Sequence, residues 1–143
     1  MKRNFKVVIS FLLLVPLFFS FNSLETSAAT WSNWQTVSGS CKVRVSTDYS
    51  TYTSRANSID VQAQSSNCSR MDYYVDVWGI DSTGYDFMID SISQQTGYFS
   101  YLTPVKKLSL SKLNYSTKAK VRVLVRGPKG NVDVWSKNIM IYR

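Results

Sequence analysis

Apolar and polar residues alternate with a period of two along most of the chain, and this pattern limits it to β-structure. The clearest case is "TKAKVRVLVRG" (117–127), where small or branched apolar residues stand between basic ones. Alternate residues of a strand point to opposite faces of a sheet, whereas a helix repeats about every 3.6 residues. The alternation predicts seven strands, at residues 41–45, 58–64, 72–81, 85–90, 106–113, 117–126 and 131–143.

Turn-forming residues separate these segments. "SSNCS", "DSTG", "QQTG" and "GPKG" are rich in the residue types that supply the backbone angles of tight turns. The last of them predicts a hairpin over residues 125–132. Short strands at regular spacing indicate an all-β fold, a single antiparallel β-sandwich of about seven strands in which each sheet has one buried and one polar face.

The N-terminus has the three parts of a secretory signal peptide. A basic start is followed by an apolar run over residues 7–21 and then by small residues that end at Ala29. The alternative is an uncleaved membrane anchor, but the run contains Pro16 and is shorter than the roughly 20 residues that span a bilayer. We expect a signal peptide at 1–29, cleaved before Thr30, and one secreted domain at 30–143.

The predicted domain contains two cysteines, Cys41 and Cys68. In an oxidising compartment one pair has a single way to bond, and the loop it closes would stabilise the fold by about 3 to 4 kcal/mol. The alternative is a redox pair or a reactive thiol. Because there is no C-x-x-C motif and no histidine to lower a thiol pKa, the sequence favours a structural disulfide.

The layout resembles the immunoglobulin and fibronectin type III sandwiches at the level of the fold. The resemblance rests on Trp34, an aromatic-rich strand at 72–78, and Leu113 leading into "AKVRVLVRGPKGN" and a last strand. Ala119 stands where fibronectin type III domains carry a tyrosine, and the cysteine spacing is not that of the immunoglobulin inter-sheet disulfide. The resemblance implies a sandwich and no particular function, because these folds host many.

Positive charge is concentrated in the C-terminal half. Without the signal peptide, 14 basic and 8 acidic residues leave a net charge of +6, and residues 101–143 hold ten of the basic residues and one of the acidic ones. The candidate anion-binding residues are Lys118, Lys120, Arg122, Arg126 and Lys129. The alternative is that this row is a solvated strand face, neutralised by Asp72 and Asp76 of a neighbouring strand at 72–80.

A second candidate surface is aromatic. Several rings lie in or beside Ser/Thr-rich turns: Trp31, Trp34, Tyr49, Tyr52, Tyr85, Tyr98, Phe99 and Tyr101. The segment "STDYSTYTSR" (46–55) has the composition of adaptable binding loops, so Tyr49 and Tyr52 are the candidate aromatic binding residues. The alternative is that such rings cap the ends of a small core.

Catalysis has few suitable residues here. The predicted domain lacks His and Glu, and its cysteines are expected to be bonded, so we expect no enzyme, catalytic residue or cofactor. The loop "DSTGYD" (81–86) offers too few oxygens for calcium, and no metal site is predicted. No motif for sequence-specific nucleic-acid recognition is present.

The sequence therefore predicts a secreted, non-enzymatic binding domain for an anionic envelope polymer, glycan or protein partner. A toxin-like or inhibitory effector that acts on a neighbouring cell or enzyme is one alternative, and a structural matrix component is another.

Overall fold

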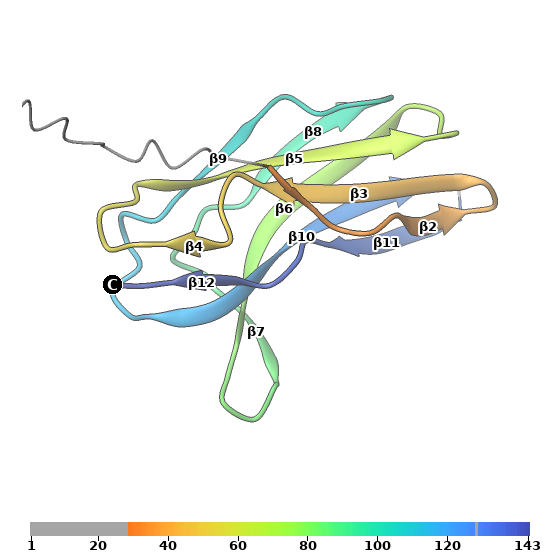
Figure 1. Cartoon of the computed structure of the whole chain (residues 1–143). Coiled ribbons are helices and arrows are strands. Elements are labelled where there is room, and N and C mark those ends of the chain that lie inside the picture. The colour runs from red at the N-terminus through yellow and green to blue at the C-terminus, as the bar shows by residue number, and fades with distance from the viewer. Residues whose placement is uncertain (1–28, 128) are drawn as a thin grey trace, which may run out of the picture.

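The computed structural model describes residues 29–127 and 129–143, which form two packed β-sheets (Figure 1). The predicted signal peptide, apart from Ala29, lies outside the described residues, as does Pro128. No helix that could cross a membrane occurs within the described ranges.

The first sheet has the order β1-β3-β5-β9, and β2 also pairs with β3. Every pairing in it is antiparallel. Its strands are β1 (Thr30–Trp31), β2 (Gln35–Ser38), β3 (Cys41–Thr47), β5 (Ser58–Ser66) and β9 (Lys106–Ser109).

The second sheet is built around the long pair β6 and β10, which are antiparallel neighbours from Lys118 opposite Ile80 to Arg126 opposite Asp72. It has the order β4-β12-β10-β6-β7, while β11 pairs with β10 and β8 pairs with β6. Its strands are β4 (Thr51–Tyr52), β6 (Met71–Ile80), β7 (Asp86–Met88), β8 (Gln95–Phe99), β10 (Thr117–Gly127), β11 (Gly130–Trp135) and β12 (Ile139–Ile141).

The all-β sandwich is confirmed, but the described chain contains twelve strands instead of about seven, and β4 runs parallel to β12. The predicted strand 131–143 is divided at Ser136. Its backbone N–H donates to the Val121 carbonyl and its hydroxyl accepts from the Val121 N–H, so β10 keeps its hydrogen bonds across the break. β8 was not predicted, because "QQTG" (94–97) was interpreted as a turn, whereas three of its four residues belong to this strand. Gly97 is required there by close packing: a Cβ would lie 2.7 Å from the Tyr73 hydroxyl.

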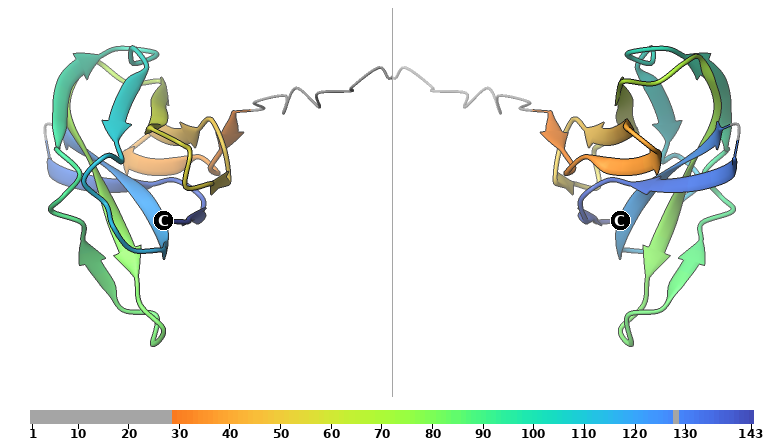
Figure 2. Two further views of the ribbon diagram at one scale, coloured as in Figure 1. Left: turned by 90° about the vertical axis from the view of Figure 1, so that its left-hand side faces the viewer. Right: turned by 90° about the vertical axis from the view of Figure 1, so that its right-hand side faces the viewer.

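The core fills the space between the two sheets, which Figure 2 shows from their ends. The apolar residues of each long strand point inward and are buried, as the alternation requires. They include Val43 and Val45 of β3, Ile59, Val61 and Ala63 of β5, Val75 and Val77 of β6, and Ala119, Val121, Val123 and Val125 of β10.

The predicted disulfide is confirmed. It joins Cys41, the first residue of β3, to Cys68, two residues beyond the end of β5, with 4.6 Å between the Cα atoms. Because β3 and β5 are neighbours, the bond links two strands of one sheet. In this it differs from the inter-sheet disulfide of immunoglobulin domains, as the cysteine spacing indicated.

Candidate functional site

The basic side chains of β10 lie on the outer face of the second sheet. Burial alternates along the strand: Ala119 and the three valines are buried, whereas Lys118 and Arg126 are exposed and Lys120 and Arg122 are partly buried. The predicted pairing with residues 72–80 is confirmed, and it places Asp76 beside Arg122 and Asp72 beside Arg126. The question is which of these charges remain available to a ligand.

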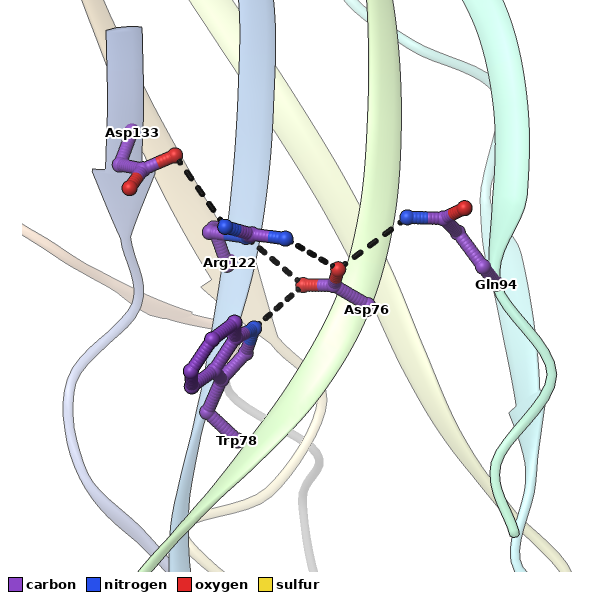
Figure 3. Close-up of polar contacts among 5 residues, drawn as sticks. All are labelled: Asp76, Trp78, Gln94, Arg122 and Asp133. Carbon is purple, nitrogen blue, oxygen red and sulfur yellow. Dashed lines mark hydrogen bonds and ion pairs between the residues drawn. The ribbon is translucent and has the colours of Figure 1, made fainter. Parts of the chain in front are cut away.

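Arg122 is held by the fold (Figure 3). Its Nη2 lies 2.6 Å from Asp76 Oδ2 and its Nε lies 3.0 Å from Asp76 Oδ1, while Nη1 is 3.6 Å from Asp133. Asp76 is only 3% exposed. The hydrogen bond to Asp76 raises the pKa of Arg122, although burial acts in the opposite direction. Two-point guanidinium–carboxylate contacts of this kind are the strong ones.

Asp76 has further donors around it. Trp78 Nε1 donates to its Oδ1 at 2.9 Å and Gln94 Nε2 donates to its Oδ2 at 3.2 Å (Figure 3). The Arg122 guanidinium also lies 4.7 Å from the centroid of the Trp78 ring. Both oxygens of this buried carboxylate are therefore satisfied by side chains from neighbouring parts of the sheet.

Lys120 is engaged as well. Its Nζ lies 2.6 Å from Asp86 Oδ2 on β7 and 4.3 Å from the centroid of the Trp135 ring. The Trp135 and Trp78 rings meet edge to face at 6.0 Å. The suggested neutralising residues were Asp72 and Asp76. The structure assigns Asp76 to Arg122 and Asp86 to Lys120, and no ion pair involves Asp72 among the described residues.

The remaining predicted cations are Lys118, Arg126 and Lys129. All three are exposed, and none has a carboxylate at ion-pair distance within the described part of the chain. The Arg126 guanidinium lies 4.4 Å from the centroid of the Tyr74 ring, so its position is fixed by an aromatic face instead of an ion pair. Lys129 lies in the turn between β10 and β11, next to the end of β10 that carries Arg126.

Arg70 is a further exposed cation with no ion pair among the described residues, and it was not predicted from the sequence. It directly precedes β6 and its guanidinium lies 3.9 Å from the centroid of the exposed Tyr98 ring on β8. In the strand ladders Asp72 lies opposite Arg126 of β10 on one side and opposite Tyr98 of β8 on the other. Arg70, two residues before Asp72, therefore belongs to the same end of the sheet as Arg126. We call Arg70, Arg126 and Lys129 the basic end. The pairing of β6 with β10 brings Arg70 to this end, and the pairing of β8 with β6, which no sequence pattern predicted, supplies its contact with Tyr98.

Tyr52 is not part of a binding loop, which corrects the sequence-based expectation. It lies in β4 opposite Ile141 and is 1% exposed. Its hydroxyl donates to Asp48 Oδ1 at 2.6 Å, and burial together with this carboxylate raises the pKa of the phenol. Tyr49 is partly buried against the core and meets the Tyr52 ring edge to face at 6.1 Å. The alternative interpretation, rings that cap the core, describes this pair.

Other rings of the predicted aromatic set are exposed, notably Trp34, Tyr85, Tyr98 and Tyr101, whereas Phe99 is buried. Tyr85 follows the turn of the β6–β7 hairpin, which extends away from the rest of the sandwich (Figures 1 and 2). In that turn Asp81 accepts from the Thr83 hydroxyl and from the Tyr85 N–H, and these bonds lower the pKa of Asp81. Its carboxylate thus serves the turn itself.

Across 29–127 and 129–143, no three His, Cys, Asp or Glu side chains come together as a metal site would require. The described surface carries exposed cations without carboxylate partners and exposed aromatic rings. Groups of these kinds are suited to contacts with polyanions and glycans.

These features define a domain of the immunoglobulin-like β-sandwich class. Residues 27–138 match the family model of the YqgA MG2 macroglobulin domain, and the chain belongs to this family. It is also 34% identical over 143 residues to the "Cell wall-binding protein YqgA" of Bacillus subtilis (strain 168), across 98% of this chain and 86% of the relative. No solved structure shows significant similarity to the chain.

Proposed function

We propose that residues 30–143 form an exported, non-enzymatic domain that binds an anionic polymer of the bacterial cell wall. The observation that carries the proposal is the set of exposed cations on and beside β10 that lack a carboxylate partner among the described residues: Lys118, Arg126 and Lys129, together with Arg70. The name of the Bacillus subtilis relative, which matches nearly the whole chain, supports the choice of the cell wall.

The arrangement of these cations suits an extended ligand. Lys118 lies at one end of β10 and the basic end lies at the other, about 26 Å away at the usual rise of a strand. A flexible polyanion that follows the strand can reach both positions, whereas a compact anion cannot. Long-range attraction of this kind weakens as added salt screens the charges.

Lys120 and Arg122 have a different part in this proposal. Because Asp86 and Asp76 already neutralise them, they stabilise the sheet and orient Trp135 and Trp78. The polymer is then bound by the flanking cations. The row predicted from the sequence is thus divided into structural and ligand-binding residues.

Export requires the predicted signal peptide at 1–29, with cleavage before Thr30. In support, Thr30 is the first residue of β1 and pairs with Thr47, so cleavage there leaves every described strand intact. Intact-mass measurement of the protein recovered from culture medium or from the wall fraction tests this step. A product that begins at Thr30 is expected, and full-length protein would contradict it.

The binding proposal is tested by sedimenting purified 30–143 with isolated Bacillus subtilis cell walls. We expect the domain to pellet with the walls at low salt and to be released as sodium chloride is raised towards about 0.5 M. Walls stripped of anionic polymers by acid should retain much less of it at low salt. Equal binding to stripped and intact walls would contradict the polyanion as ligand.

A further inference from the structure

The outer face of the first sheet carries a groove that is separate from the basic row. Two hollows of about 440 and 320 Å³ lie side by side, and both are lined by Trp34, Ser66 and Asn67. Lys42 lines the first, and Gln64 and Tyr101 line the second. Because they share three lining residues, the hollows are direct neighbours, and we call the two together the first-sheet groove.

Two exposed aromatic rings flank this groove. Trp34 is 41% exposed and Tyr101 is 64% exposed, and neither belongs to the core. Large aromatic rings are normally at least partly withdrawn from water, because burial of their apolar faces is favourable. Two such rings left open beside a depression that also has polar lining residues are the arrangement expected of stacking platforms for a ligand.

The platforms are fixed in position by their neighbours. The Arg44 guanidinium lies 4.5 Å from the centroid of Trp34 and 4.6 Å from the centroid of Trp31. Arg44 Nε and Nη2 donate to Gln64 Oε1 at 2.9 and 2.6 Å, and Gln64 Nε2 donates to the Tyr101 hydroxyl at 2.8 Å. This chain of contacts connects the two rings across β3 and β5. Because the side chains are already held in place, little conformational entropy is lost when a ligand binds.

The disulfide stabilises the rim of the groove. Lys42 and Ser66 are opposite each other in the β3–β5 ladder, and the next residues on either strand lead directly to Cys41 and Cys68. Asn67, between Ser66 and Cys68, has a positive φ of 56°, a conformation that few residue types adopt readily. A covalent bond across this bend keeps Ser66 and Asn67 in place beside Trp34.

The chemistry of the lining narrows the class of ligand. Aromatic faces attract the apolar, weakly positive C–H face of a pyranose ring, and the side chains of Gln64, Ser66 and Asn67 can hydrogen-bond sugar hydroxyl or acetamido groups. An apolar segment of protein or lipid would bury these polar groups without partners, which costs free energy. A pure polyanion would find Lys42 as the one cation lining these hollows.

We propose that the first-sheet groove binds a glycan chain of pyranose rings, stacked on Trp34 and Tyr101. The inference rests on the proposed function for the cell wall as the source of such a glycan, and it adds a second site with a different chemistry. The two sites lie close to one end of the sandwich: Arg70 of the basic end follows Cys68 by two residues. The start of β3 and the ends of β5 and β10 lie on the same side in Figure 1. One cell wall can therefore bind at both sites.

The test uses purified 30–143 and two soluble probes, a neutral tetramer of β-1,4-linked N-acetylglucosamine and peptide-free glycan strands from stripped Bacillus subtilis walls. Binding is followed by tryptophan fluorescence. We expect a saturable change with at least one probe that persists at about 0.5 M sodium chloride. Response to the tetramer shows that the sugar rings suffice, and response to the strands alone shows that their acidic groups also contribute, with Lys42 as the cation in reach.

Variants make the assignment specific. Trp34→Ala and Tyr101→Ala should each weaken glycan binding by about tenfold or more, a change of about 1.4 kcal/mol. Tyr85→Ala, which removes an even more exposed ring from the β6–β7 hairpin, should leave glycan binding unchanged. Since Tyr101 is exposed, its variant should melt with the parent protein, which keeps the test valid if Trp34→Ala is less stable. For Trp34→Ala itself, whose fluorescence lacks the groove indole, binding is measured by calorimetry.

The outcomes separate this inference from the proposed function. Failure of both probes to bind, or binding that Tyr101→Ala does not weaken, overturns the glycan site. Lys118→Gln with Arg126→Gln should leave glycan binding intact while it reduces retention on intact walls at low salt. Glycan binding in a protein with no affinity for anionic wall polymer would contradict the proposed polyanion site and leave the glycan site standing.

Discussion

Arg122 and Asp76 face each other across the β6–β10 ladder and make two nearly parallel contacts of 2.6 and 3.0 Å. Both side chains are largely withdrawn from solvent, at 17% and 4% exposure. Removal of one member of such a pair leaves the other buried and without its counter-charge. The centre of the basic row is therefore a structural element.

Replacement of Asp76 should be strongly destabilising. Asp76→Ala leaves the Arg122 guanidinium without its main partner, and we expect the free energy of unfolding to fall by about 3 to 5 kcal/mol in urea titrations. Asp133→Ala removes the longer, more exposed contact and should cost less than about 1 kcal/mol. Similar losses in the free energy of unfolding for the two variants would contradict a larger stabilising contribution from the buried Asp76–Arg122 pair.

The two buried tyrosines should respond in opposite ways to loss of their hydroxyl groups. Tyr52→Phe removes a bond to Asp48 and should destabilise the domain by about 1 to 3 kcal/mol. The Tyr73 hydroxyl is buried without a hydrogen-bond partner among the described residues, so Tyr73→Phe should be neutral or slightly stabilising. Thermal melts of the two variants provide the measurement, and an equal cost would contradict the assigned bonding.

Stability should decline in alkali because of the same tyrosines. Burial raises the pKa of Tyr73, and burial together with Asp48 raises that of Tyr52, whereas in the unfolded chain both ionise near pH 10. Their folded-state pKa is the higher one, so their contribution is fully present below about pH 10 and is lost as pH rises further. The loss approaches about 1.4 kcal/mol per pH unit for each group.

The double variant Tyr52→Phe/Tyr73→Phe isolates this contribution. Its melting temperature should fall less than that of the parent protein when the pH is raised from about 9 to about 11. Parallel curves for the two proteins would indicate that other groups, such as the lysines, dominate the alkaline response.

Loss of the disulfide should act on stability and on the groove together. Cys41→Ser/Cys68→Ser opens a loop with a sequence separation of 27, which should lower the free energy of unfolding by about 3 to 4 kcal/mol. The double variant should remain folded at room temperature but bind glycan more weakly, because the Ser66–Asn67 rim is no longer fixed. Glycan titrations well below its melting temperature check this, and full affinity there would show that the rim needs no covalent support.

Features set by local alternation could be predicted from the sequence. The inward valines of β10 and the β10–β11 hairpin follow from period two and turn residues, and the pairing of β10 with β6 follows from the proposed sandwich; the structure contains each of them. The disulfide was predictable because only one pairing exists.

Features that depend on distant partners could not be predicted. Tyr52 is buried because two-residue β4 runs parallel to β12, nearly ninety positions later in the chain, and no pattern in "STDYSTYTSR" reveals this. The contact that positions Arg70 at the candidate site comes from Tyr98 of β8, a strand whose alternation is interrupted at Gly97. The division of the basic row required knowledge of which aspartates reach it, and Asp86 does so from the separate β7 hairpin.

The most direct test of the account is wall binding by two triple variants with the same change in net charge. Lys118→Gln/Arg126→Gln/Lys129→Gln removes the exposed cations on and beside β10, while Arg55→Gln/Lys107→Gln/Lys112→Gln removes exposed cations from β9 and from loops. In low-salt sedimentation with intact Bacillus subtilis walls, we predict an affinity loss of about tenfold or more for the first triple variant and near-parental affinity for the second. Equal losses would mean that net charge alone drives binding and would contradict a site on the second sheet.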